Sequence, residues 1–237
     1  MHDEFQSTQW SEVINAGRNS SPESRQALES LCRVYWFPLY AYARRRVPTV
    51  DEAQDVTQAF FADFLEKNSV ASARPERGKF RAFLLASFKN FLSKYWEKKR
   101  TLKRGGGQTV LSLNFELADS QLRIEPTGGL TPDQLYDQQW VIALLGQILN
   151  RLKDEAEQNG KSDQFRELKG FIVGDHQEST YAQVAERLDM TEAAAKKSAS
   201  RMRKRYRELL REEIARTVLG PEEVEDEIHN LFAVLNL

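Results

Sequence analysis

Basic side chains recur on one face of the segment 191–207, at the spacing of a helix. The members of this face are Lys196, Lys197, Ser200, Arg201, Arg203, Lys204 and Arg207. Ammonium and guanidinium groups bind phosphate oxygens, and arginine or lysine can also donate to base edges in the major groove. Thr191 and Glu192 begin the same segment, at the end that would enter a groove. These residues are therefore candidate contacts to duplex DNA.

The elements that must position this basic face are two short helices joined by a turn. Thr180 can cap the first helix and form a capping box with Gln183, while Thr191 can cap the second. The apolar positions at helical spacing are Tyr181, Val184, Ala185 and Leu188, then Ala195, Ala199, Met202 and Tyr206. Asp189 occupies the turn position where glycine is common, and aspartate tolerates the left-handed conformation better than most residues.

This pattern is typical of a helix-turn-helix, whose second helix lies in the major groove. Apolar residues continue through Leu209, Leu210 and Ile214, so the second helix is expected to extend beyond the basic face. An ordinary amphipathic helix pair with a solvated basic face is the alternative that the pattern alone leaves open.

A second basic set is interleaved with aromatic residues between Phe80 and Arg100. Apolar residues recur at helical intervals (Phe80, Phe83, Leu84, Phe88, Phe91, Leu92, Tyr95) among Lys89, Asn90, Lys94, Lys98, Lys99 and Arg100. Cations bind phosphates and rings stack on unpaired bases, so this mixture suits single-stranded nucleic acid. We expect a core position for Phe83, Leu84, Phe88 and Phe91. For Tyr95 and Trp96, core and nucleic-acid roles both stay open.

Composition predicts a soluble helical protein of one large or two small domains. The chain has 237 residues, of which 41% are hydrophobic and 29% are charged. The net charge of −1 hides an uneven distribution, with basic residues concentrated in 89–104 and 196–207 and acidic residues in 222–227. Such basic patches are what a nucleic acid would meet.

Catalytic and metal-binding patterns are missing from the sequence. Cys32 is the single cysteine, and His2, His176 and His229 are too far apart for ligand spacing. The carboxylates are not joined with histidine or lysine in a catalytic motif, so we expect neither an enzyme nor a metal or cofactor. With no signal peptide and no apolar run of spanning length, a cytoplasmic protein without membrane insertion is expected.

Helical periodicity and caps run through most of the chain. They predict helices over 22–43, 49–67, 80–100, 131–158, 163–173, 180–188, 191–214 and 222–235, with a shorter helical pattern before residue 20. Pro38 is expected to kink or divide the first of these helices. Residues 68–79 have loop composition, and the glycine-rich stretch from Gly105 begins a linker.

The order of these pieces resembles the bacterial RNA polymerase sigma factors of the extracytoplasmic-function type in the sigma-70 family. The matching segments are DEAQDVTQAFFADF (51–64), FRAFLLASFKNFLSKY (80–95) and TEAAAKKSASRMRKRYREL (191–209). Thr8-Gln9-Trp10, RGKFRAFLLASFKNFL, KRGGG and YRELLREEIARTV look like a subgroup found in planctomycete-like bacteria. Such factors keep only sigma regions 2 and 4.

The resemblance implies an all-α fold with two small helical domains joined by a flexible linker. The expected parts are an N-terminal helical extension (1–20), a sigma region 2-like domain (21–104), a linker (105–130), a sigma region 4-like helix-turn-helix domain (131–220) and an acidic helix (221–237). The last helix exceeds the two-region plan. It could cover a basic face or cap the C-terminal domain, and we expect the cap.

The resemblance also implies partners and contacts. Asp51, Asp55 and Gln58 match the segment that docks on the clamp helices of the largest subunit of core RNA polymerase. The segment that melts and reads the −10 element of promoter DNA is matched by Arg77, Lys79, Arg81, Lys89, Asn90 and Lys94, here called the −10 set. The helix with the basic face matches the −35 reader. The family often has tryptophan where this chain has Phe83, so it stays open how this chain would hold the melted strand.

Two functions stay in competition on the sequence. The first is a sigma factor that binds core polymerase and directs promoter-specific transcription initiation. The alternative is a helix-turn-helix regulator that binds an operator without core polymerase and uses its N-terminal half as a sensor or dimerisation domain. The promoter sequence, the activating signal and an anti-sigma or other regulatory partner are left open by the sequence.

Overall fold

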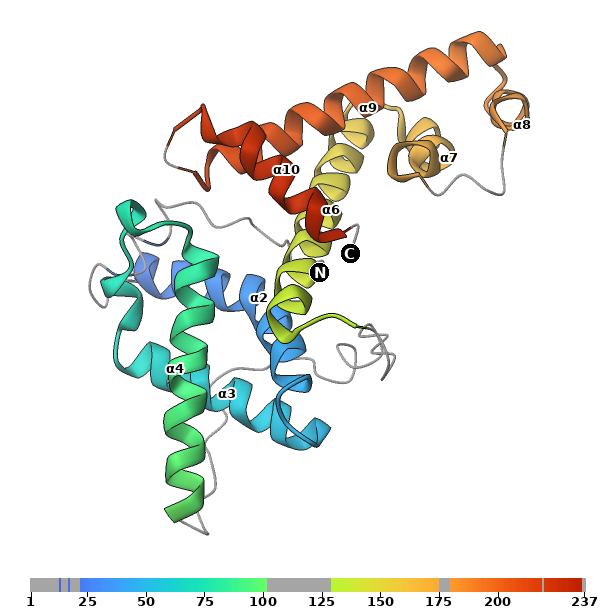
Figure 1. Cartoon of the computed structure of the whole chain (residues 1–237). Coiled ribbons are helices and arrows are strands. Elements are labelled where there is room, and N and C mark those ends of the chain that lie inside the picture. Colours follow the sequence, from blue (N-terminus) through green and yellow to red (C-terminus); the bar gives the residue numbers. More distant parts are fainter. Residues whose placement is uncertain are drawn as a thin grey trace. The chain divides into compact units, whose positions relative to one another are not determined.

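The computed structural model describes residues 13, 17, 22–101, 129–174, 180–218 and 220–235, and all regular elements in these ranges are helical (Figure 1). They are α2 (Pro22–Arg44), α3 (Val50–Glu66), η1 (Ser69–Ser72), η2 (Pro75–Arg77), α4 (Phe80–Thr101), α6 (Pro132–Gln158), α7 (Ser162–Val173), α8 (Tyr181–Arg187), α9 (Glu192–Ala215) and α10 (Glu223–Leu235). The predicted all-α class is confirmed. The expected linker, apart from its last residues 129 and 130, lies outside the described residues.

Packing divides the chain into two compact units. The first comprises residues 1–144 together with 215–237, and the second comprises residues 145–214. The first unit therefore holds α2, α3, α4, the beginning of α6 and the acidic helix α10, while the second holds the rest of α6, α7, α8 and nearly all of α9. The domain boundaries expected from the sequence divide the chain by function and not by packing, and they stay a prediction.

The core of the first unit is an aromatic cluster between α2, α3 and α4. On α3, the residues Ala53, Val56, Phe60, Phe61 and Phe64 repeat at helical spacing and are all buried. The Phe60 ring lies 4.9 Å from that of Phe88 and 5.6 Å from that of Phe91, both on α4. Edge-to-face rings at such distances contribute beyond the area that they bury. This cluster fixes α4 against α3.

Pro38 does not divide the helix that contains it. The helix α2 runs without interruption from Pro22 to Arg44 with Pro38 inside. A proline in a helix interior removes a hydrogen bond and clashes with the preceding turn. The residues that follow it, Leu39 and Tyr40, are fully buried, so tertiary packing offsets this cost.

Caps and a left-handed turn shape the second unit as the sequence predicts. Thr180 and Gln183 form a complete capping box at the start of α8. The Thr191 hydroxyl accepts a hydrogen bond of 3.2 Å from the backbone N–H of Ala194 at the start of α9. Between the two helices Asp189 adopts φ +49°, the left-handed conformation. The buried core below them consists of Leu168, Phe171, Val184 and Ala199.

Candidate nucleic-acid and polymerase interfaces

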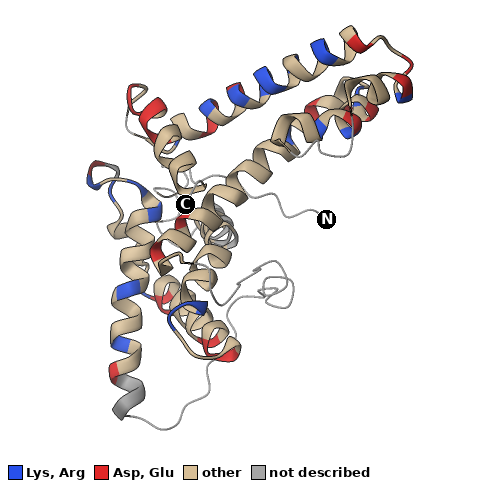
Figure 2. Cartoon of the chain, turned by 45° about the vertical axis from the view of Figure 1, so that its right-hand side comes forward, with Lys and Arg blue, Asp and Glu red and all other residues tan. Residues whose placement is uncertain are grey.

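The α9 helix presents the predicted basic face to solvent. Along the part that carries this face, the fully buried positions are Ala195 and Ala199, whose small side chains let α9 approach the core of its unit. The residues Lys196, Lys197, Ser200, Arg201, Arg203 and Lys204 are all exposed. Figure 2 shows lysines and arginines recurring along this helix. The predicted residues are thus brought together on one accessible face.

The cations of this face differ in how they are held. Lys196 pairs with Glu192 at 2.6 Å, and this hydrogen bond raises the pKa of the lysine. Among the described residues, Lys197, Arg201 and Arg203 have no carboxylate within ion-pair distance. These three cations are available for phosphates or base edges. Thr191 uses its hydroxyl to cap the helix and lies at the same end as Glu192.

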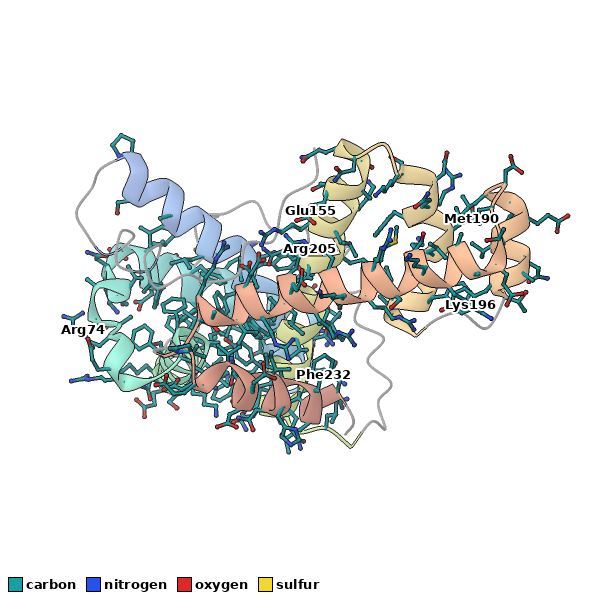
Figure 3. The ribbon with its side chains drawn as sticks, turned by 90° about the horizontal axis from the view of Figure 1, so that it is seen from above. Arg74, Glu155, Met190, Lys196, Arg205 and Phe232 are labelled. Atoms are coloured by element: carbon teal, nitrogen blue, oxygen red, sulfur yellow. The ribbon has the colours of Figure 1, made fainter. Side chains whose placement is uncertain are left out.

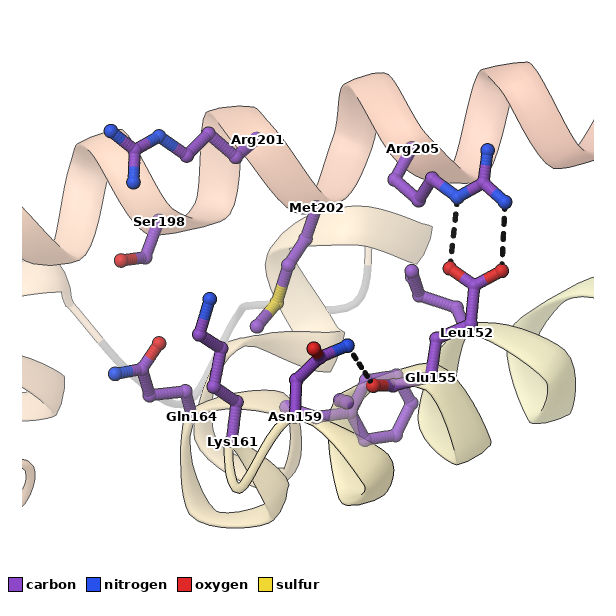
Figure 4. A pocket seen from close by; sticks show the side chains of 11 residues that line it. Leu152, Glu155, Asn159, Lys161, Gln164, Ser198, Arg201, Met202 and Arg205 are labelled. Carbon is purple, nitrogen blue, oxygen red and sulfur yellow. Dashed lines mark hydrogen bonds and ion pairs between the residues drawn. The ribbon is translucent and has the colours of Figure 1, made fainter.

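Arg205 takes a different part, which the sequence pattern did not reveal. Its Nε and one Nη each donate at 2.8 Å to an oxygen of Glu155 on α6 (Figure 4). The other Nη donates to Glu212 at 3.1 Å, and Glu212 accepts from Arg151 at 3.0 Å. The Arg205 hydrogen bond lowers the pKa of Glu155. This network braces α6 against α9, and Figure 3 shows Arg205 beside Glu155.

A cavity of about 300 Å³ lies beside this brace, between α6, α7 and α9. Leu152, Ala156, Phe165 and Met202 supply its apolar walls, and Arg201 stands at its edge (Figure 4). The salt bridge between Arg205 and Glu155 borders it. No spacing signal along the sequence indicates this brace, because Arg205 and Glu155 lie on different helices, 50 positions apart.

In the structure, three members of the −10 set are paired with carboxylates, and the other three are exposed to solvent. Arg77, Asn90 and Lys94 are exposed. Lys79 and Arg81 both pair with Glu227 of α10, and Lys89 pairs with Asp133 of α6. The sequence pattern named these residues as candidate DNA contacts and did not predict their pairing with carboxylates.

Arg81 is the most enclosed member of the −10 set. Its side chain is 13% exposed, its guanidinium lies 4.8 Å from the centre of the Trp140 ring, and Asp137 is 3.9 Å away. The Tyr136 hydroxyl donates to the Arg81 carbonyl at 3.0 Å. Burial raises the pKa of the Asp137 carboxyl, and the nearby Arg81 charge acts in the opposite direction.

The polar face of α3 carries the predicted polymerase contacts. Asp51 and Asp55 are exposed and Gln58 is half-buried, whereas Val56 and Thr57 on the opposite face are fully buried. The helix is fixed by a cap, in which the Thr49 hydroxyl accepts from the Glu52 N–H at 3.1 Å. A rigid helix that shows two carboxylates to solvent is a suitable surface for a basic protein partner.

Residues 37–101, from within α2 to the end of α4, match a family model described as Sigma-70 region 2. This segment of the chain is similar to sigma-70 region 2 and is called region 2 here. This match supports a sigma factor of the sigma-70 family, a non-enzymatic family whose region 2 binds core RNA polymerase and recognises the −10 element of promoter DNA. A search of curated proteins and a search of solved structures each found no match.

Within region 2, a groove follows the line where α3, η1 and α4 meet. It encloses about 1060 Å³ and is lined by residues that include Asn90, Phe91, Lys94 and Tyr95. Tyr95 and Trp96 are half-buried, and the Arg46 guanidinium lies 5.6 Å from the centre of the Trp96 ring. Two accessible members of the −10 set thus share this groove with aromatic rings.

The predicted core of region 2 is confirmed at Leu84 and Phe88, which are buried. Phe83 and Phe91 are half-buried instead, because both rings lie at the edge of the aromatic cluster and contact Phe64 and Phe60 respectively. Edge positions of this kind keep one side of a ring accessible to a ligand.

The described part of the chain shows no group of three or more histidine, cysteine or acidic residues placed to hold a metal ion. None of the described helices is both long and apolar enough to cross a membrane. Cys32 is buried.

Proposed function

We propose that this protein is a sigma factor of the extracytoplasmic-function type, in the planctomycete-like subgroup. It binds core RNA polymerase in the cytoplasm and directs promoter-specific initiation, with region 2 at the −10 element and the α8–α9 pair, as a helix-turn-helix, at the −35 element. The observation that carries the proposal is the Sigma-70 region 2 match at 37–101, in a chain that also presents an exposed basic helix at 192–215.

Docking on the polymerase uses the polar face of α3. Asp51, Asp55 and Gln58 contact the clamp helices of the largest subunit, and the exposed carboxylates on a capped helix support this assignment. Opposite charges across such an interface increase the association rate and select the partner.

Opening of the −10 element uses the groove of region 2. Asn90 and Lys94 line it beside Phe91 and Tyr95, and Arg77 lies exposed in η2. Bases of a melted strand can stack on the rings while the cations bind its phosphates. Lys79, Arg81 and Lys89 become part of this surface when their ion pairs with Glu227 and Asp133 break.

Recognition of the −35 element uses the beginning of α9. Thr191 and Glu192 lie at its N-terminus and Lys196, Lys197, Ser200, Arg201, Arg203 and Lys204 follow on the exposed face. A recognition helix contacts base edges with its N-terminal residues and phosphates with those further along. We assign base contacts to the residues of this face from Thr191 to Arg201, and phosphate contacts to Arg203 and Lys204.

Run-off transcription from genomic DNA fragments tests the proposal. The purified protein, core polymerase and the two together are compared on the same fragments. A discrete set of transcripts that requires both components is the expected result. Tight binding of the protein alone to specific duplex fragments, with no new transcript when core polymerase is added, would instead establish the helix-turn-helix regulator.

A further inference from the structure

Three cations of the −10 set are paired with carboxylates from other helices of the same unit, two of them with a residue near the C-terminal end of the chain. Glu227 on α10 pairs with both Lys79 and Arg81, Asp137 on α6 lies 3.9 Å from Arg81, and Asp133 pairs with Lys89. All six residues belong to one compact unit. The acidic helix α10 therefore packs with region 2, and the expectation that it caps the C-terminal domain is wrong. Charge complementarity between Glu227 and two cations gives the physical reason.

Glu227 is the centre of this arrangement. Its side chain is only 1% exposed, while Lys79 and Arg81 are 32% and 13% exposed. A buried carboxylate is costly unless opposite charges and hydrogen bonds satisfy it. Here two cations do so, and Val224 and Leu231 of α10 are buried at one helical turn on either side. The helix is thus anchored by apolar packing at Val224 and Leu231, with the carboxylate between them.

A carboxylate and a phosphate bind these cations through the same kind of interaction. Each presents anionic oxygens that accept from guanidinium and ammonium groups. A Lys79 or Arg81 side chain that donates to buried Glu227 cannot bind the backbone of a DNA strand at the same time. The enclosure of Arg81 by Trp140 strengthens this exclusion, since a strand would have to displace it from the ring as well.

We propose that α10 is an internal competitor for the melted promoter strand. Glu227 takes the place of a phosphate on Lys79 and Arg81, so the protein alone is held in a state of low affinity for single-stranded DNA. Strand binding displaces α10 and so removes Glu227 from both cations, and the strand also draws Arg81 away from the Trp140 ring. This inference rests on the proposed role of the two residues in reading the −10 element.

The matched control comes from the neighbouring residue. Asp226 precedes Glu227 on α10 but is exposed. The variants Glu227→Gln and Asp226→Asn each remove one negative charge from the same helix turn. Any difference between them therefore reports the contact of Glu227 with the cations and not the change in net charge.

Fluorescence anisotropy of a fluorescein-labelled, mixed-sequence single-stranded DNA measures the effect on the full chain. Glu227→Gln is expected to bind roughly tenfold more tightly, because apparent affinity is reduced by the fraction of molecules that are binding-competent. Its salt dependence should steepen by about 1.4 in slope, since each phosphate contact on a single strand contributes about 0.7. Asp226→Asn should match the wild type within about twofold. Adding Lys79→Ala and Arg81→Ala to Glu227→Gln should remove the gain.

If Glu227→Gln binds the single-stranded DNA no more tightly than Asp226→Asn does, the proposal is overturned. Glu227 would then only stabilise the packing of α10 on region 2. Hydrogen–deuterium exchange of wild-type protein covers the case in which Glu227→Gln fails to fold. The backbone amides of α10 should lose protection when the DNA is added, and unchanged or increased protection also overturns the proposal. Run-off transcription with wild-type protein separately decides whether the sigma function holds, so the two failures are distinguishable.

Discussion

At the scale of single residues, the cations of α9 divide into two groups with different environments. Lys197, Arg201 and Arg203 are exposed without a carboxylate at ion-pair distance in the described structure. Arg205 is engaged by Glu155 on one side and Glu212 on the other. The first group is suited to a ligand, because its charges are uncompensated, and Arg205 is suited to holding two helices together.

Replacing Lys197 or Arg201 with alanine should weaken binding to a −35 duplex identified by run-off transcription. A lost bidentate base contact costs about 1–3 kcal/mol and relaxes specificity at that base. A lost phosphate contact lowers affinity evenly across sequences and flattens the salt dependence. Titrations of specific and mutated duplexes separate the two. Lys169→Ala, at an exposed position on α7, is the charge-matched control. If both variants bind like this control, the recognition face lies elsewhere.

Arg205→Lys should lower the thermal stability of the protein at neutral pH by about 1 kcal/mol or less, because the pair is partly exposed and screened. Lysine cannot reproduce the two parallel hydrogen bonds to Glu155. The lowered pKa of Glu155 means that this stabilisation is present above its unfolded value near 4.5 and is lost as pH falls through the folded pKa. Thermal unfolding monitored by circular dichroism should therefore show the difference between variant and wild type shrinking in acid. Arg203→Lys, on the exposed side of the same helix, should unfold like wild type at every pH.

At the scale of elements, the connection between α8 and α9 depends on one left-handed residue. Asp189 has φ +49°, and the backbone N–H groups of Asp189 and Met190 donate to the carbonyls of Glu186 and Ala185. This turn determines the direction in which α9 leaves α8. The orientation of the α3 helix also depends on a few residues. Its cap at Thr49 and its buried Phe60 and Phe61 leave one polar face exposed to solvent.

Asp189→Val should destabilise the protein by about 1–3 kcal/mol, the cost of a β-branched residue in the left-handed region. Asp189→Gly should leave stability unchanged or raise it slightly, because glycine adopts this conformation without steric cost. Chemical denaturation measures both. Equal stability of the two variants would mean that the turn can relax to a negative φ.

Combined Asp55→Ala and Gln58→Ala changes should weaken the pull-down of core polymerase without unfolding the protein. Both residues lie on the polar face of α3, and the buried face that supports the aromatic cluster is untouched. Asp154→Ala on α6 removes a comparable exposed carboxylate outside region 2 and serves as control. Unchanged capture of core polymerase by the folded double variant would contradict the docking assignment.

At the scale of the whole molecule, the proposed function needs two DNA-reading parts on one chain. The predicted linker of roughly 26 residues could span on the order of 85 Å if fully extended. By itself it would permit many separations between the DNA elements. Both parts of a sigma factor are held on one polymerase surface, so the distance and the angular phase of the two elements become fixed.

Insertion of about 5 bp between the −35 and −10 elements rotates one by roughly half a turn. Transcription by the polymerase holoenzyme should be abolished, as measured by run-off assays on templates with and without the insertion. Binding of the sigma protein alone to a duplex that carries only the −35 element is the internal control and should not change. Transcripts that persist from the same start site would rule out the two-element mechanism on a common surface.

The local features of this protein follow from its sequence. Apolar periodicity placed the helices within a few residues of their observed ends, and threonine caps marked the starts of α3, α8 and α9. The left-handed turn at Asp189 and the exposed basic face of α9 were also predicted. All of these depend on residues within a few positions of each other, where spacing along the chain determines which groups meet.

Only the tertiary structure decided which charges are compensated. Arg81 and Glu227 are separated by 146 positions, and Arg205 and Glu155 by 50, so no spacing rule relates them. The uninterrupted helix at Pro38 likewise depends on the burial of Leu39 and Tyr40. A sequence shows how many cations a helix face carries. Whether a distant carboxylate already occupies them depends on how the helices pack, since ion pairing requires atoms to approach within a few ångströms.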